Sequence, residues 1–243
     1  MLKSQRHDMI LQQLEASGAV LVTTLARALE VDPVTIRRDL VELEKSGRLH
    51  RVHGGAVARQ GVASRTSGPD YVRRIAEAAA RTIPDGSVVF LGPGALTVEI
   101  VPFLQRYQHL TVITNALAVA WGVAHQRQHT LHIVGGQVGA DLGVFGDTEA
   151  LRRIHADRVI LEAGGLDAER GFTHDDRETA AMARAIVALG AEVVALVAPE
   201  RLGRAGALFV ATASEIDVLI TAREADTAAM WDLSELGIRV VLT

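Results

Sequence analysis

Apolar side chains recur at helical spacing near the start of the chain. Ile36, Leu40 and Leu43 fall at i, i+4 and i+7 and form one apolar stripe. Arg37 and Arg38 lie on the opposite side of the same helix. The pattern therefore predicts an amphipathic helix that turns two arginines toward solvent or toward a polyanion.

The residues around this stripe mark where the helix begins and ends. Asp32 can accept hydrogen bonds from amides of the first turn, and Pro33 suits that turn because it needs no amide donor. We expect Gly47 to end the helix. Polar and apolar residues alternate over residues 48–52, and a glycine turn leads to residues 56–57, so we expect two short strands.

Two shorter helices are expected upstream. Apolar residues within Ser4–Ser17 predict the first of them. Leu25 and Leu29 mark the second, for which Thr23 or Thr24 is the expected N-cap. Three helices followed by a small strand pair are typical of a winged helix-turn-helix.

From residue 70 onward, helical and extended patterns alternate. A helix is predicted over residues 70–83, and short apolar strands follow with helices between most of them. The predicted strands are residues 87–91, 111–114, 131–134, 158–161, 192–197, 218–221 and 239–242. Apolar strands without a two-residue alternation are typical of a parallel sheet covered on both faces. The expected fold class is α/β, with a winged helix-turn-helix domain before a largely parallel α/β domain.

The composition changes between these two patterns. Residues 59–69, RQGVASRTSGP, are small, polar and without periodicity, as linkers are. We therefore predict a winged helix-turn-helix DNA-binding domain over residues 1–58, a linker over 59–69, and an α/β domain over 70–243. A chain of 243 residues is long enough for two domains.

Charge is divided unevenly along the chain. The net charge of −4 separates into +2 for residues 1–60 and −6 for the remainder. From Lys45 to Arg59 there are four basic residues and no acidic one, so the field around the predicted strand pair favours phosphate.

Composition also bounds the compartment and the cofactors. The chain has no cysteine, which excludes a disulfide framework and a thiolate metal site and suits a reducing cytosol. No apolar run reaches the roughly 18 residues of a membrane span, and the N-terminus lacks a signal-peptide core. We expect a cytoplasmic protein with no membrane partner and no cofactor.

Two clusters of polar residues could suggest other chemistry. His125, His129 and His132 have spacings that could bind a metal on one helix, but they lie in a connection that runs into a strand, so no metal site is expected. Asp175 and Asp176 could form a carboxylate pair, although a loop charge or a helix N-cap is the simpler interpretation.

The sequence resembles one known family in both parts. The segment Thr35–Ala56, TIRRDLVELEKSGRLHRVHGGA, is similar nearly throughout to the signature of the DeoR family of bacterial transcription regulators. The second part is similar to the effector domain of that family, which is related in fold to ribose-5-phosphate isomerase. The matching landmarks are FLGPGALTVE, VITNA, VGGQ, ADRVILEAGGLDAERGFT and EIDVLIT. The resemblance implies a repressor that binds double-stranded operator DNA. It also implies that the protein forms a homo-oligomer and senses a small effector, commonly a phosphorylated sugar.

The candidate DNA contacts lie on the amphipathic helix and the strand pair after it. They are Thr35, Arg37, Arg38, Arg51, His53 and Gly54. A residue in the first turn of a recognition helix can reach a phosphate or a base edge, and basic residues of a wing contact the DNA backbone. By itself an arginine pair is more often a solvated helix face, and Arg51 and His53 could be no more than wing surface.

The candidate effector pocket lies where several predicted strands end in glycine or small polar residues. In an open parallel sheet the ligand crevice lies at those strand ends, where helix N-termini offer amides to an anion. The candidate ligand-binding residues are Gly92, Gly94, Thr97, Thr114, Asn115, Gly135, Gly136, Asp176 and Arg201. One glycine turn is weak evidence, and the site depends on several of them meeting.

The chain departs from the family pattern at this pocket. Where the family usually has an Asp-Ser-Gly-Thr-Thr phosphate loop, residues 92–96 read Gly-Pro-Gly-Ala-Leu, which keeps only the second glycine and the following Thr97. Ala181 and Ala183 stand where an acidic residue and a lysine are usual. Residues 198–201, Ala-Pro-Glu-Arg, replace Asp-Ser-Ser-Lys. We therefore expect an unusual effector, or weak binding of simple sugar phosphates.

Two alternatives to an effector-controlled regulator remain open. A sugar-phosphate isomerase with an appended DNA-binding module would need a carboxylate base near the substrate carbon, and Gly92, Ala181 and Ala198 count against it. Alternatively, the second domain could serve only for oligomerisation, without any effector.

Overall fold

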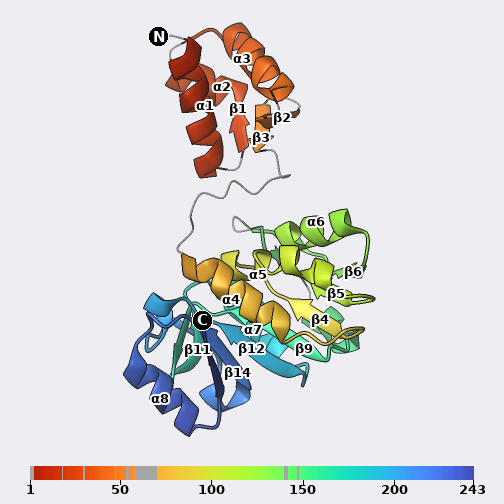
Figure 1. Cartoon of the computed structure of the whole chain (residues 1–243), viewed down its shortest axis with the longest axis vertical. Coiled ribbons are helices and arrows are strands. Elements are labelled where there is room, and N and C mark those ends of the chain that lie inside the picture. Colours follow the sequence, from red (N-terminus) through yellow and green to blue (C-terminus); the bar gives the residue numbers. More distant parts are fainter. Residues whose placement is uncertain are drawn as a thin grey trace. The chain divides into compact units, whose positions relative to one another are not determined.

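A computed structural model describes residues 3–17, 19–29, 31–46, 48–52, 55–58, 70–139, 142–146 and 148–243. The chain divides into two compact units, residues 1–66 and 67–243 (Figure 1). The predicted linker, residues 59–69, lies outside the described residues, and so do His53, Gly54 and Gly47.

The first unit combines three helices with a small antiparallel sheet. Its elements are α1 (Lys3–Ser17), β1 (Ala19–Leu21), α2 (Val22–Ala28), α3 (Pro33–Lys45), β2 (Leu49–Val52) and β3 (Gly55–Ala58). The strand order is β1-β3-β2, so the predicted strand pair gains a third strand. The core includes Ile10, Leu14, Leu25 and Leu49, together with the predicted stripe of α3. The winged helix-turn-helix architecture is confirmed.

Local signals explain α3 but not α2. The Asp32 carboxylate accepts a hydrogen bond of 2.6 Å from the Val34 amide, and Pro33 occupies the first turn, as predicted. The expected N-cap of α2 is wrong, because this helix begins at Val22 and contains Thr23 and Thr24. The chain passes directly from β1 into α2, and Val22 is buried. Pairing of β1 with β3 and burial of Val22 therefore outweigh the capping preference of threonine.

The second unit is built on a parallel sheet of seven strands. The strand order is β15-β14-β12-β9-β4-β5-β6, and every pairing in it is parallel. The strands are β4 (Val88–Leu91), β5 (Thr111–Thr114), β6 (Thr130–Ile133), β9 (Arg158–Glu162), β12 (Glu192–Leu196), β14 (Val218–Thr221) and β15 (Arg239–Leu242). All seven predicted strands are present, with ends shifted by at most one residue. The expected α/β class is confirmed.

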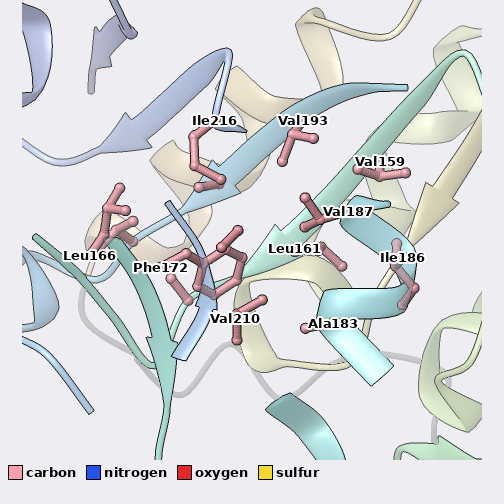
Figure 2. Packing of buried hydrophobic residues seen from close by; sticks show 14 of the residues in the cluster. Val159, Leu161, Leu166, Phe172, Ala183, Ile186, Val187, Val193, Val210 and Ile216 are labelled. Atoms are coloured by element: carbon pink, nitrogen blue, oxygen red, sulfur yellow. The ribbon is translucent and has the colours of Figure 1, made fainter. Parts of the chain in front are cut away.

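Helices cover both faces of this sheet. The α-helices are α4 (Asp70–Arg81), α5 (Ala95–Val98), α6 (Leu117–Gln126), α7 (Arg177–Val187) and α8 (Thr227–Glu235), and the 3-10 helices are η1 (Val101–Arg106), η2 (Thr148–Arg153), η3 (Pro199–Arg201) and η4 (Ala213–Glu215). One apolar cluster joins the sheet to α4, α5 and α6, and the other joins it to α7 and α8. In Figure 2, Val159 and Leu161 of β9 lie near Ile186 and Val187 of α7.

Within the described part of the second unit, five short strands were not predicted. They are β7 (Gln137–Val138), β8 (Val144–Phe145), β10 (Gly165–Asp167), β11 (Gly171–His174) and β13 (Leu208–Ala211). The last three form an antiparallel sheet, in which the buried Phe172 joins the cluster under α7 (Figure 2). This sheet places the end of β11 beside the start of α7. Among the described residues, no helix is both long and apolar enough to cross a membrane.

Candidate functional sites

The outward face of α3 carries the predicted arginines. Arg37 and Arg38 are exposed and Thr35 is half-buried, while the apolar stripe that includes Ile36 and Leu40 is buried in the core. The helix therefore presents one polar, basic face to its surroundings. Packing of the opposite, apolar face against the core fixes the position of the helix.

A buried carboxylate that the sequence did not reveal as important holds α3 against α1. Asp39 is 2% exposed and accepts hydrogen bonds from Arg6 at 2.5 and 3.0 Å and from His7 at 3.1 Å. Burial alone would raise the pKa of Asp39, but the hydrogen bonds from Arg6 and His7 outweigh it, so this pKa lies below its ordinary value. These hydrogen bonds hold α3, and with it the face that carries Arg37 and Arg38, in a fixed position relative to α1.

The strand pair after α3 is tied to the end of that helix. The backbone amide of Arg51 in β2 donates a hydrogen bond of 3.0 Å to the Glu44 carboxylate. The exposed Arg51 guanidinium lies 3.9 Å from the same carboxylate. Arg51 is thus held close to α3, as a wing residue should be. The other predicted wing contacts, His53 and Gly54, lie outside the described residues.

In the second unit, a cavity of about 450 Å³ lies at the carboxyl ends of the parallel strands. Its walls come from the turn after β4, the end of β9, the end of β11 and the segment after β12, with α4 at its edge. Tyr71, Gly94, Glu162, His174, Asp176 and Arg201 are among the residues that line it. The location is the one expected for a ligand crevice in an open parallel sheet.

The turn after β4 is shaped around the Glu162 side chain. The Leu96 amide donates a hydrogen bond of 2.7 Å to Glu162 Oε2. Gly94 has a φ of 136°, and a Cβ atom there would lie 2.2 Å from the same oxygen. Burial raises the pKa of Glu162, opposed by the Leu96 hydrogen bond and by the charge of Arg201. The Glu162 carboxylate thus occupies one of the amide donors of this turn.

His174 lies next to Glu162 in the wall of the cavity. Its Nε2 lies 3.0 Å from the backbone oxygen of Glu162. Because a carbonyl oxygen only accepts, Nε2 carries the hydrogen. Burial lowers the pKa of His174, against the raising effects of this hydrogen bond and of the nearby aspartates. His174 therefore favours its neutral form.

The remaining charged groups of the cavity each have a polar partner, but Arg201 and Asp175 alone form an ion pair among its described lining residues. Arg201 Nη1 lies 3.3 Å from a carboxylate oxygen of Asp175, and the Tyr71 hydroxyl donates a hydrogen bond of 3.0 Å to Glu200. Asp176 accepts hydrogen bonds of 2.7 Å from the amide and the hydroxyl of Thr179, which lower its pKa. The interpretation of Asp176 as a helix N-cap is therefore confirmed, and the same residue also faces the cavity.

Gly94, Asp176 and Arg201 line the cavity, whereas the other predicted ligand residues lie behind or away from it. The hydroxyls of Thr97 and Thr114 donate to the backbone oxygens of Gly94, at 2.8 Å, and Leu91, at 2.6 Å.

Close packing accounts for two more members of the predicted set, Gly92 and Gly136. A Cβ atom at Gly92 would lie 2.7 Å from Leu161, and one at Gly136 would lie 2.2 Å from the Phe145 oxygen. The exposed Gly135 lies beside Gly136 in the connection after β6.

Asn115 lines a second, much smaller cavity of about 10 Å³. Its Nδ2 donates to the Val144 oxygen at 3.2 Å, while its buried Oδ1 has no hydrogen-bond partner in the described chain. The small cavity shares Pro93, Glu162 and His174 with the large one. Asn115 is thus close to the predicted pocket, although it does not line the larger space.

The three histidines whose spacing could suit a metal site, His125, His129 and His132, do not share one helix. His125 belongs to α6 and contacts Trp121, with ring centroids 4.2 Å apart and ring planes tilted by 46°, whereas His132 belongs to β6. Within the described part of the chain, no three His, Cys, Asp or Glu side chains are grouped so that they could hold a metal ion.

Known proteins resemble the chain along its length. The repressor CsqR of Escherichia coli K12 is 25% identical over 98% of this chain and 94% of its own. The regulator GolR of Listeria innocua is 28% identical over 99% and 98%. The glycerol-3-phosphate regulon repressor of Escherichia coli K12 is 26% identical over all of both chains. These relatives are named as transcription regulators, and none of the three as an enzyme.

Similar solved structures include enzymes and a translation factor. Ribose 5-phosphate isomerase A from Methanocaldococcus jannaschii has a TM-score of 0.42 at 14% identity, over 56% of this chain and 55% of its own. Translation initiation factor eIF-2B from Pyrococcus horikoshii OT3 has a TM-score of 0.41 at 14% identity, over 83% and 67%. A likeness at this level carries no argument about activity.

Two family models match the two units. Residues 6–62 match the DeoR-like helix-turn-helix domain, and residues 70–223 match the DeoR C terminal sensor domain. The second match alone covers more than half of the 243 residues. The chain therefore belongs to the DeoR family of transcription regulators.

Proposed function

We propose that this regulator is a repressor that binds operator DNA through α3 and the β2–β3 wing, and that a small metabolite in the second unit changes its affinity for DNA. As a DeoR-family regulator the chain is not an isomerase, so the proposal concerns the residues, the sign of regulation and the effector. The arrangement of α3 carries it: the helix is fixed through Asp39 and its apolar stripe, while Arg37 and Arg38 stay exposed.

The proposed contacts divide between base edges and backbone. Arg37 and Arg38 contact guanine edges or phosphates in the major groove, and Thr35 contacts the DNA from the first turn. Arg51, His53 and Gly54 contact the phosphate backbone from the wing. The basic surplus between Lys45 and Arg59 supports this assignment, because the field there attracts phosphate.

A homo-oligomer would present two such helices to two half-sites. Large apolar side chains in the second unit support a contact between copies: Trp121 of α6 is 54% exposed and Leu142 is 48% exposed. The Leu117 amide at the start of α6 donates to the Leu142 oxygen at 2.9 Å, so these residues lie on one surface. We expect sedimentation to show that Trp121→Glu dissociates the oligomer and that Trp231→Glu, at an exposed position on α8, does not.

The proposed effector site is the cavity of about 450 Å³, a size within the roughly 300–1,000 Å³ of small-molecule sites. Gly94, Asp176 and Arg201 face the ligand, while Gly92, Thr97, Thr114, Asn115, Gly135 and Gly136 shape the surrounding strand ends. The name of the glycerol-3-phosphate regulon repressor supports an effector of the sugar or sugar-phosphate kind. The regulator would act in the cytoplasm, where its operator lies.

Electrophoretic shifts test the DNA contacts, with an operator recovered by selection from random DNA. Arg37→Ala and Arg38→Ala should each weaken binding by about 1–3 kcal/mol. A lost base contact would relax specificity at one position, whereas a lost phosphate contact would weaken all sequences alike. Arg170→Ala removes the same charge from an exposed turn of the second unit and serves as the control. Unchanged affinity of both α3 variants would contradict the proposal.

A further inference from the structure

The effector cavity carries many more acidic than basic side chains. Glu162, Asp175, Asp176 and Glu200 line it, and Arg201 is the one lysine or arginine among its described lining residues. A cavity with this balance attracts positive charge and repels phosphate. The family resemblance alone would imply the opposite preference.

Two donors that could serve a phosphate are already engaged. Arg201 pairs with Asp175 at 3.3 Å, and the Leu96 amide donates to Glu162 at 2.7 Å. Pro93, in the same turn, has no amide hydrogen to offer. An anionic ligand would have to displace carboxylates of the protein from these donors, in a space that other carboxylates also face.

The acceptors, by contrast, are in excess. Asn115 is fully buried, and its Oδ1 has no hydrogen-bond partner in the described chain. That oxygen lies in the small cavity bordered by Glu162 and His174, which also border the effector cavity. A buried acceptor without a partner favours a ligand or a water that donates a hydrogen bond. Hydroxyl and ammonium groups are such donors.

We propose that this cavity binds a polyhydroxylated amine, with its ammonium group toward the carboxylates of Glu162 and Glu200 and its hydroxyls toward the remaining acceptors, and that it selects against the phosphorylated sugar. The inference rests on the proposed effector role of the cavity. It differs from that role in naming the charge of the ligand, which the charged residues at the end of β9, after β11 and after β12 determine.

Calorimetry on the full-length protein at fixed ionic strength tests the charge preference. The probes are glucosamine, glucose and glucose 6-phosphate, with the galactose series as a second scaffold. We expect the amine to bind about tenfold more tightly than the neutral sugar, the effect of one added ionic contact, and the phosphate to bind most weakly. Tighter binding of the phosphate than of the amine would overturn the inference.

Two variants assign the preference to the carboxylates. Glu162→Gln keeps an acceptor for the Leu96 amide and removes the charge, and Glu200→Gln does the same for the Tyr71 hydroxyl. Each should reduce the amine-to-glucose affinity ratio by about threefold to tenfold, and Glu200→Gln remains informative if Glu162→Gln fails to fold. Glu169→Gln, at an exposed turn outside the cavity, is the matched control. An unchanged ratio in both variants would overturn the inference.

Operator binding by the wild type is measured in the same preparations. If operator DNA is bound but no probe binds at millimolar concentration, the inference on the ligand is wrong and the DNA-binding proposal stands. If operator DNA is not bound at all, the proposed function is wrong, whichever sugar the cavity prefers. The two failures are therefore distinguishable.

Discussion

The two units each enclose a carboxylate beneath a proposed binding site, in opposite electrostatic settings. In the first unit, Asp39 accepts from Arg6 and His7, and these hydrogen bonds hold its pKa below the ordinary value in spite of burial. In the second, Glu162 accepts from the Leu96 amide, and burial raises its pKa. The first carboxylate is neutralised within the protein and organises a helix face. The second forms no ion pair with a described residue and lines the proposed ligand cavity.

Removal of the Asp39 charge should give the largest effect. Asp39→Asn leaves Arg6 and His7 without their anionic partner and should lower the stability of the first unit by roughly 1.5–3 kcal/mol, the range for hydrogen bonds to charged groups. Hydrogen exchange of α1 and α3 amides in the full-length protein measures it. Asp8→Asn, at an exposed position of α1, is the control. Equal protection in both variants would show that Asp39 does not hold the two helices together.

Local signals made the first unit the more predictable one. The cap by Asp32, the proline after it and the apolar stripe of α3 all lie within one short segment, and the structure confirms each of them. Asp39 was missed because its partners lie in α1, 32 and 33 positions away. Burial of a polar residue between two helices cannot be read from the periodicity of one helix.

The effector cavity was less predictable because its walls come from distant segments. The strand ends were correctly located, but Tyr71, Glu162 and His174 were not expected there. Thr97 and Thr114 were expected to face the ligand, because a hydroxyl at a strand end can serve a phosphate, yet both donate to backbone oxygens. One signal for the cavity was present in the sequence: an acidic residue, Glu162, directly follows the predicted strand over residues 158–161.

The two carboxylates should also give opposite dependences of stability on pH. Asp39 has a lowered folded pKa, so its contribution is present above its unfolded pKa of about 4 and is lost as the pH falls through the folded value. Glu162 has a raised folded pKa, so its contribution is full below an unfolded value of about 4.3 and is lost as the pH rises through the folded pKa.

Spectroscopy can separate these two dependences. Both tryptophans, Trp121 and Trp231, lie in the second unit, so their fluorescence follows the unfolding of that unit alone. Hydrogen exchange of α3 follows the first unit. We expect Glu162→Gln to reduce the loss of second-unit stability as the pH rises above the unfolded value of about 4.3, and Asp39→Asn to flatten the acid limb of the first unit. The same slope in wild type and Glu162→Gln would contradict the assignment.

A substitution at Gly94 tests how tightly the β4 turn closes on Glu162. In Gly94→Ala the new methyl group would lie 2.2 Å from Glu162 Oε2, at a φ of 136° that disfavours side chains. We expect the second unit to lose about 1–3 kcal/mol, measured by tryptophan fluorescence in denaturant. Gly135→Ala is the control, because a Cβ atom there meets nothing within 4 Å. Equal stability of the two variants would mean that the turn does not close on the carboxylate.

The smallest effect on stability is expected at Arg201, whose ion pair with Asp175 has side chains 51% and 62% exposed. An exposed pair contributes about 0–1 kcal/mol, so Arg201→Ala should leave the unfolding of the second unit nearly unchanged, in contrast to Asp39→Asn. Its effect on ligands is the more informative measurement. Loss of a positive charge from the cavity should leave glucosamine binding unchanged or tighten it by a few-fold. If Arg201→Ala instead abolished a tight interaction with glucose 6-phosphate, Arg201 would be a phosphate partner, and the second unit would recognise the anion that its four carboxylates are expected to repel.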